Sequence, residues 1–126
     1  MSAEVLIIDG DAAYVKAFSE ELTKKYPEVS VNSASSAREA MSLLAGTTPS
    51  AIVIEARLPD MSGVELLGVV RESKRLKNIP VFIASARYTE PADRTEALLA
   101  GASAFFVKPL NVSDLCREIE YFSGVK

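Results

Sequence analysis

The chain has 126 residues, of which 48% are hydrophobic and 25% are charged, and its net charge is −3. This size and balance are typical of one globular domain, and we expect residues 1–126 to form a single domain. The sequence contains no histidine and one cysteine. The composition therefore excludes catalytic centres that need histidine, metal sites with histidine ligands, zinc sites built from several thiolates, and disulfide bonds within the chain.

The sequence shows no targeting signal and no dense cluster of basic residues. Its first residues lack a basic start and a long apolar run, so no signal peptide is expected, and no apolar stretch reaches the length of a membrane span. The 17 acidic and 14 basic residues include no dense basic cluster, so we expect this domain to contact neither nucleic acid nor a membrane. The unpaired Cys116 is typical of a reducing compartment, which predicts a cytoplasmic protein.

In the first third of the chain, short apolar runs alternate with stretches of helical spacing. Residues 5–8 predict a strand that stops at the turn residues 9–11, and a helical face follows until Pro27. Residues 29–32 alternate like an edge strand. A second helix is predicted by a narrow apolar stripe and ends at Gly46; the stripe consists of Ala37, Ala40, Met41 and Leu44.

The middle of the chain repeats this order. Residues 51–54 predict a fully buried strand that ends at Glu55. A long turn over residues 58–63 follows, and Ser62 is predicted to cap the next helix. That helix has an apolar face and a side that we expect to be solvated, which carries Arg71, Glu72, Lys74 and Arg75.

The last third predicts two more units of the same kind. Residues 81–84, with Pro80 as a possible first position, form the fourth strand, and a helix is predicted from Pro91 to a terminating Gly101. Residues 104–107 form the fifth strand. Asn111 is predicted to cap the last helix, in which Cys116 is a buried small hydrophobe and the buried face consists of Val112, Leu115, Ile119 and Phe122.

Five alternating strands and helices predict one doubly wound α/β domain with helices on both faces of a parallel sheet. In such a sheet functional groups collect at the carboxyl ends of the strands. That rule selects a small set of candidate residues: Asp9, Gly10, Asp11, Glu55, Ser85 and Lys108. Carboxylates that surround one ammonium suit a divalent cation and a phosphoryl group, because carboxylates hold magnesium while lysine and serine contact phosphate oxygens.

Four segments in this order resemble the receiver domain of two-component response regulators over essentially the whole chain. The segments are Ile7-Ile8-Asp9, Glu55 with Leu58-Pro59-Asp60-Met61-Ser62-Gly63, Pro80 to Arg87, and Gly101-Ala102 with Lys108-Pro109-Leu110. The resemblance implies a flavodoxin-like (βα)5 fold with strand order 2-1-3-4-5. It places Ser85 and Lys108 on phosphoryl oxygens, Phe105 at the aromatic switch, Asp9 with Asp11 at the magnesium site, and a cis bond before Pro109.

The sequence departs from that family pattern at two positions. Glu55 stands where the family has the aspartate that accepts phosphate, and Gly10 stands at the second position of the acidic pair. The extra methylene moves the carboxylate by about 1.5 Å, and a misplacement of about 1 Å can cost roughly 100-fold in rate. Magnesium binding at Asp9 and Asp11 is expected to be weak, and no cofactor is required.

These departures predict an atypical receiver, or pseudo-receiver, that acts by protein contact and is not an enzyme. We hypothesise that Glu55 partly imitates a phosphorylated aspartate by pairing with Lys108, and with Ser85 as a further contact. The partners that the resemblance implies are a sensor kinase and an effector or output domain. The surface of the fourth and fifth helices is a candidate site for a homodimer.

Several alternatives stay open. Asp9 and Asp11 also suit the positive end of the first helix, Ser85 also suits a local backbone cap, and Phe105 also suits the core. A different class of function is a magnesium-dependent phosphatase similar to haloacid dehalogenases, with Asp9 as nucleophile and Asp11 as general acid and base. That family's usual threonine is replaced by Ala13, and its late acidic metal motif is absent.

Overall fold

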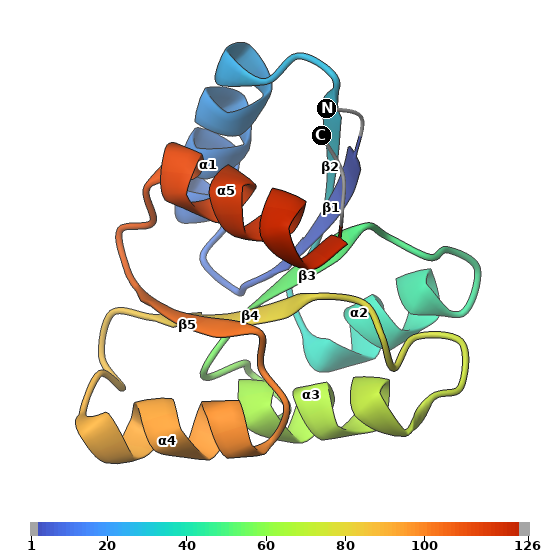
Figure 1. The fold of residues 1–126 in the computed structure, drawn as a ribbon, viewed down its shortest axis with the longest axis vertical. Coiled ribbons are helices and arrows are strands. Elements are labelled where there is room, and N and C mark those ends of the chain that lie inside the picture. The colour runs from blue at the N-terminus through green and yellow to red at the C-terminus, as the bar shows by residue number, and fades with distance from the viewer. Residues whose placement is uncertain (1–2, 124–126) are drawn as a thin grey trace.

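The computed structural model describes residues 3–123, so both ends of the predicted domain, residues 1–2 and 124–126, lie outside the described part. Strands and helices alternate along the chain (Figure 1). The strands are β1 (Ala3–Ile8), β2 (Val29–Ala34), β3 (Ala51–Glu55), β4 (Val81–Ser85) and β5 (Ala104–Val107). The helices are α1 (Ala12–Lys25), α2 (Ala37–Leu44), α3 (Gly63–Glu72), α4 (Pro91–Leu99) and α5 (Val112–Ser123).

The strands form one parallel sheet in the order β2-β1-β3-β4-β5, which confirms the predicted flavodoxin-like topology. β1 lies between β2 and β3, so its last residue Ile8 is in register with Ala34 on one side and Ile54 on the other. Consecutive strands of the same direction need crossover helices, and these cover both faces of the sheet. The sheet therefore brings the carboxyl ends of β1, β3, β4 and β5 to one edge.

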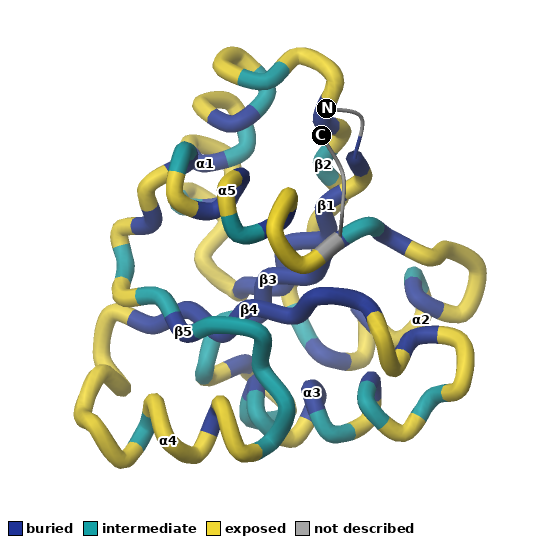
Figure 2. Tube along the Cα trace, viewed as in Figure 1, coloured by how far each residue is buried: buried dark blue, intermediate teal, exposed yellow. Residues whose placement is uncertain are grey.

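Two hydrophobic cores lie on the two faces of the sheet. α1 and α5 cover one face, and α2, α3 and α4 cover the other (Figure 1). The central strands are dark blue in Figure 2 because both of their faces are buried, whereas α4 is mostly exposed and has Ala97 as its buried residue. Each fully buried Leu, Ile or Val stabilises the fold by about 1.5–3 kcal/mol, which explains why the uninterrupted apolar runs became the inner strands.

The predicted helix boundaries are confirmed by the capping contacts. Ser62 caps α3 in a reciprocal arrangement with Glu65, and the Asn111 side chain accepts the backbone N–H of Asp114 at the start of α5. Pro91 is the first residue of α4, where its missing N–H costs nothing. Gly101 follows the end of α4 with a φ of +108°, a left-handed conformation that glycine adopts without strain.

The loop between β3 and α3 is tied to α2 by one carboxylate. Both oxygens of Asp60 accept backbone N–H groups, from Ala37 and Arg38, at 2.9 Å each. These bonds lower the pKa of Asp60, because they favour the charged carboxylate at the positive end of α2. The loop that follows Glu55 is thus held in one position by the neighbouring helix.

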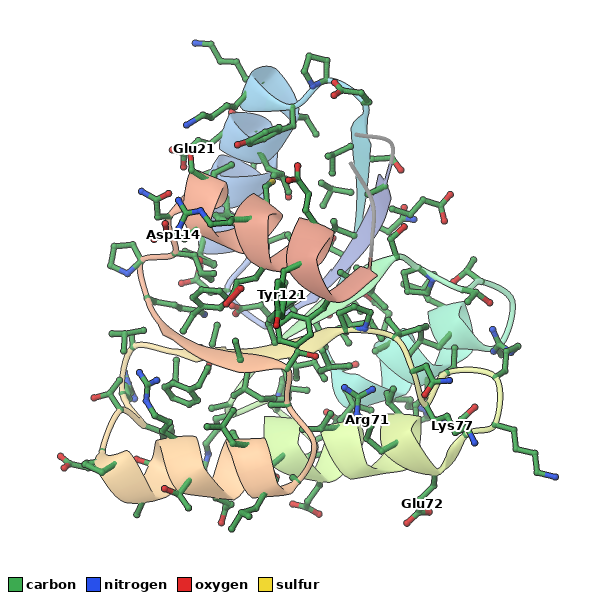
Figure 3. The ribbon with its side chains drawn as sticks, in the orientation of Figure 1. Glu21, Arg71, Glu72, Lys77, Asp114 and Tyr121 are labelled. Atoms are coloured by element: carbon green, nitrogen blue, oxygen red, sulfur yellow. The ribbon has the colours of Figure 1, made fainter. Side chains whose placement is uncertain are left out.

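Arg71 was expected on a solvated side of α3, and this prediction is wrong. Its guanidinium donates to the carbonyl oxygens of Gly101 at 2.9 Å, Lys77 at 3.0 Å and Ile79 at 2.7 Å. Figure 3 labels Arg71 on α3 together with Lys77, whose loop it contacts. A guanidinium carries several donors in a fixed plane, so it can satisfy carbonyl groups that no helix or strand pairs. Charge alone does not reveal that role in a sequence.

Three further details differ from the expectations. Phe122 was placed on the buried face of α5 but is 43% exposed, and Met41 of α2 is 38% exposed. Phe122 lies near the end of its helix, where one edge packs against Phe82 and the rest meets solvent. Pro80 precedes β4 instead of starting it; its carbonyl still accepts the N–H of Ile52. Cys116 is buried as predicted, and burial raises the pKa of its thiol to about 11.

Candidate functional site

The strand ends bring four of the predicted site residues to one edge of the sheet. Asp9 directly follows β1, Glu55 ends β3, Ser85 ends β4, and Lys108 directly follows β5. All of them line a cavity of about 920 Å³ that opens at this edge. The position agrees with the rule that doubly wound sheets place their sites at the carboxyl ends of strands.

Asp9 is a buried carboxylate with a defined partner for each oxygen. Its exposed fraction is 6%, and its backbone N–H donates to the carbonyl of Ala34. Oδ1 accepts the backbone N–H of Asp11 at 2.9 Å, and Oδ2 forms a salt bridge with Lys108. Because a buried charge without partners would be strongly destabilising, these contacts explain how the carboxylate is kept at the sheet edge.

Lys108 pairs with two carboxylates at once. Its ammonium contacts Asp9 and lies 2.6 Å from Oε1 of Glu55, and its side chain is 10% exposed. Burial lowers the pKa of Lys108, but the hydrogen bonds that its ammonium donates to Asp9 and Glu55, together with their negative charges, outweigh burial and raise the pKa above its ordinary value. The ammonium is therefore charged at neutral pH. The peptide bond between Lys108 and Pro109 is cis, as the resemblance implied.

Glu55 reaches across the pocket instead of pointing into solvent. While Oε1 contacts Lys108, Oε2 accepts the backbone N–H of Arg57 at a longer 3.4 Å. The side chain is 16% exposed. Its predicted pairing with Lys108 is therefore present in the structure.

Ser85 has the local contacts of a backbone cap. The side chain is buried, and Oγ accepts the backbone N–H groups of Arg87 at 3.2 Å and Tyr88 at 2.9 Å. These bonds shape the turn that leads from β4 toward α4. Among the described residues no hydrogen bond joins Ser85 to Glu55, so the additional contact that we hypothesised for Glu55 is not formed.

Asp11 lies at the rim of the cavity and caps α1. Its Oδ1 accepts the backbone N–H of Tyr14 at 3.0 Å, which is the helix-end role left open by the sequence. In the part of the chain that the structure describes, no group of three acidic or cysteine side chains is arranged to hold a metal ion. Asp9 and Asp11 were predicted to be weak metal ligands. In the structure, Oδ1 of each residue accepts a backbone N–H group.

Phe105 belongs to the core on the face covered by α2, α3 and α4. It is 7% exposed, and the guanidinium of Arg94 lies 5.6 Å from its ring centroid. Phe105 therefore has the core position that the sequence left open as the alternative to a switch.

One contributor to the site was missed in the sequence. The ammonium of Lys108 lies over the ring of Tyr14, 4.4 Å from the ring centroid, at a distance typical of a cation–π contact. Tyr14 follows the cap residue Asp11 by three positions, so the first turn of α1 directs it toward the strand ends. An aromatic residue one turn after a site loop is the signal that could have identified it.

The comparisons with known proteins agree with this fold. Residues 5–120 match the response regulator receiver domain family. The chain is 35% identical over 92 residues to an uncharacterized 14.6 kDa protein of Leptolyngbya boryana, covering 73% of this chain and 70% of that protein. It is 31% identical over 111 residues to response regulator PleD of Caulobacter vibrioides, covering 88% of this chain and 24% of PleD. It is also 40% identical over 89 residues to two-component response regulator ORR11 of Oryza sativa, covering 69% of this chain and 59% of ORR11.

Solved structures show the same architecture. The receiver domain of the Francisella response regulator 1452 has a TM-score of 0.79 at 26% identity and covers 98% of both chains. Chemotaxis response regulator CheY4 of Vibrio cholerae has a TM-score of 0.82 at 23% identity, covering 97% of this chain and 99% of that one, which supports the fold alone.

The parallel sheet, with its carboxylate and lysine pocket at the strand ends, defines a domain of the CheY-like fold. The chain belongs to the response regulator receiver domains of two-component signalling. The comparisons give no support to the phosphatase alternative built on Asp9 and Asp11. Among the described residues, no helix has the length and apolar character needed to cross a membrane.

Proposed function

We propose that this chain is an atypical receiver domain that signals through protein contacts and does not run the ordinary phosphorylation cycle. The observation that carries the proposal is the bond from Lys108 to Glu55, which occupies the phosphoacceptor position. A glutamate there already supplies a negative charge to the lysine that a phosphoryl group would otherwise engage. The proposal also includes a role without enzymatic turnover and a cytoplasmic location, the latter supported by the free thiol of Cys116.

The chemistry of the pocket disfavours phosphoryl transfer to Glu55. Its carboxylate lies one methylene farther from the backbone than an aspartate would, and in-line attack depends on close positioning. The position after Asp9 is Gly10, which contributes no side-chain oxygen. Both differences affect the same step, because acceptor geometry and metal binding act together in phosphoryl transfer.

The pocket partly resembles an engaged switch. Glu55 is paired with Lys108, and Phe105 is buried, two features that favour a constitutively biased state. Ser85, however, accepts local backbone N–H groups instead of contacting Glu55. A carboxylate carries one negative charge, whereas a phosphoryl group adds up to two and three acceptor oxygens, so the imitation of phosphorylation is incomplete.

The proposed contact surface for partners is formed by α4, β5 and α5, with β5 between the two helices (Figure 1). Apolar side chains are exposed across it: Leu98 at 44%, Leu99 at 84%, Val107 at 52%, Tyr121 at 78% and Phe122 at 43%. Tyr121 is labelled on α5 in Figure 3. Exposed apolar side chains are frequent at protein interaction sites, so we propose that a kinase, an effector domain or a second copy of this chain binds at these elements.

This surface is tested with Leu99→Glu, which places a charge at its most exposed leucine. If a second copy binds there, light scattering after gel filtration should show a dimer for the wild type and a monomer for the variant. Val69→Glu is the control, since Val69 is an exposed apolar residue of α3. Identical masses for Leu99→Glu and Val69→Glu would contradict the homodimer.

The test of the main proposal is phosphorylation by a small phosphodonor with Mg²⁺, followed by intact-protein mass. The wild type should gain no phosphoryl group, whereas the double variant Glu55→Asp with Gly10→Asp should gain one. The second substitution is sterically possible, because a Cβ on Gly10 would meet its nearest atom, the carbonyl oxygen of Ser35, at 3.5 Å. Uptake of a phosphoryl group by the wild type would overturn the proposal.

A further inference from the structure

Three groups enclose the ammonium of Lys108. Asp9 and Glu55 contact it directly, and the ring of Tyr14 covers a further side with its centroid 4.4 Å away. With 10% of the side chain exposed, the ammonium is largely removed from solvent. Two carboxylates and one aromatic face are the partners that a buried cation needs in order to remain charged.

The same pocket lacks free oxygen ligands for the divalent cation that receiver domains are expected to bind. Magnesium needs octahedral oxygen ligands, normally one or two carboxylates completed by water. Here Oδ2 of Asp9 and Oε1 of Glu55 already face the ammonium of Lys108, and Oδ1 of Asp9 accepts a backbone N–H. Gly10 supplies no further oxygen. The residues therefore do not fit a divalent cation while Lys108 holds this position.

The packing of Tyr14 within α1 holds its ring next to the ammonium of Lys108. Its ring stacks on Phe18 of α1, with centroids 5.9 Å apart and an interplanar angle of 13°, so the orientation of the ring is set by packing within the helix. Its buried hydroxyl makes no hydrogen bond of normal geometry among residues 3–123. Burial raises the pKa of Tyr14, and the Leu110 backbone and the charge of Lys108 oppose that rise. The ring face, and not the hydroxyl, is what this residue offers to the pocket.

We propose that Lys108 is the resident cation of this pocket, positioned by Tyr14, and that it makes the pocket independent of a divalent metal. The proposal rests on the proposed function in one respect, because it assigns an ionic state to the same signalling pocket. This proposal concerns which cation neutralises Asp9 and Glu55, whereas the proposed function concerns whether Glu55 accepts a phosphoryl group. Tyr14 is a positioning residue in this arrangement.

The test is a titration with Mn²⁺, in which binding is followed by calorimetry and by loss of the free-ion electron spin resonance signal. The wild type should show no saturable site. Lys108→Met should show a saturable site, at least about tenfold tighter than any binding detected for the wild type, because two carboxylates lose their neutralising charge and become available to the ion. Tyr14→Leu should also gain affinity, to a smaller extent, since Lys108 loses one of its three contacts.

Tyr14→Phe is the matched control, because it keeps the ring face and removes the unbonded hydroxyl; it should behave as the wild type. Wild-type binding equal to that of Lys108→Met would overturn the proposal, and so would a Tyr14→Leu variant with no gain over Tyr14→Phe.

A second measurement does not depend on the folding of any variant. A ligand that binds the folded state raises the thermal midpoint by mass action. Since Lys108 holds the pocket, millimolar Mg²⁺ should leave the thermal midpoint of the wild type unchanged. A midpoint that rises with Mg²⁺ would reject the resident-cation proposal. The proposed function is judged separately by the mass of the protein after phosphodonor treatment, so the failure of one can be distinguished from the failure of the other.

Discussion

Oε1 of Glu55 lies 2.6 Å from the ammonium of Lys108, although 53 positions separate the two residues in the chain. The contact exists because β3 and β5 end at the same edge of a parallel sheet, with β4 between them. It links the carboxylate that ends β3 to the lysine that follows β5. The two side chains therefore determine the ionic state of the pocket together.

Replacement of Glu55 by glutamine should destabilise the fold by about 1–2 kcal/mol, because one charged hydrogen bond to a largely buried ammonium is weakened. Urea unfolding of wild type and variant measures this difference in free energy of unfolding. Glu72→Gln on the exposed side of α3 is the control and should change stability by less than about 0.5 kcal/mol. Equal stability of Glu55→Gln and wild type would show that the ion pair contributes nothing.

Stability should decline in the alkaline range through Lys108. Because its pKa is raised on folding, the stabilisation is complete below the ordinary value of 10.5 and is lost as the pH rises through the pKa of the folded state. Urea unfolding between neutral pH and pH values above 10.5 measures this loss. Lys108→Met should show a shallower decline; Tyr14 and Cys116, whose pKa values are also raised, remain in both proteins. Parallel curves for the two proteins would contradict the assignment to Lys108.

Arg71→Met should destabilise the fold by about 2–3 kcal/mol, because three carbonyl oxygens around the α3–β4 loop and Gly101 lose their donor. Methionine keeps the aliphatic part of the side chain, so the loss reports on the guanidinium. Lys77→Met serves as the control: Lys77 accepts through its backbone, and its exposed side chain should be replaceable without cost. Comparable losses for both variants would point to a general charge effect instead.

Gly63→Ala should destabilise the fold by about 3 kcal/mol, since the added Cβ would lie 2.3 Å from the backbone oxygen of Glu55. The clash involves backbone, so the end of β3 or the start of α3 would have to move. Gly68→Ala in the same helix has no atom within 4 Å of its Cβ and should stabilise the protein by about 0.5–1 kcal/mol. Chemical denaturation should show a lower free energy of unfolding for Gly63→Ala and a higher one for Gly68→Ala. A Gly63→Ala variant as stable as the wild type would refute this close approach.

Local patterns were sufficient where the physical cause is local. Strand and helix order followed from apolar runs and helical spacing, and the starts of α3 and α5 followed from Ser62 and Asn111, because a cap bonds to backbone only a few residues away. The set of candidate site residues followed from strand ends and from a resemblance to receiver domains. These inferences do not depend on the tertiary contacts between the elements.

The partners of several side chains depend on the tertiary structure. Tyr14 over Lys108, Arg71 on carbonyls of two loops, and Ser85 turned to its own backbone all depend on contacts that periodicity does not encode. The exposed Phe122 shows the same limit, because its burial depends on how far the sheet extends beneath α5. The sequence alone was sufficient to predict a five-stranded receiver fold with Glu55 at the end of the third strand. The pairing of this glutamate with Lys108, hypothesised from the sequence, forms because the sheet brings distant strand ends within bonding distance.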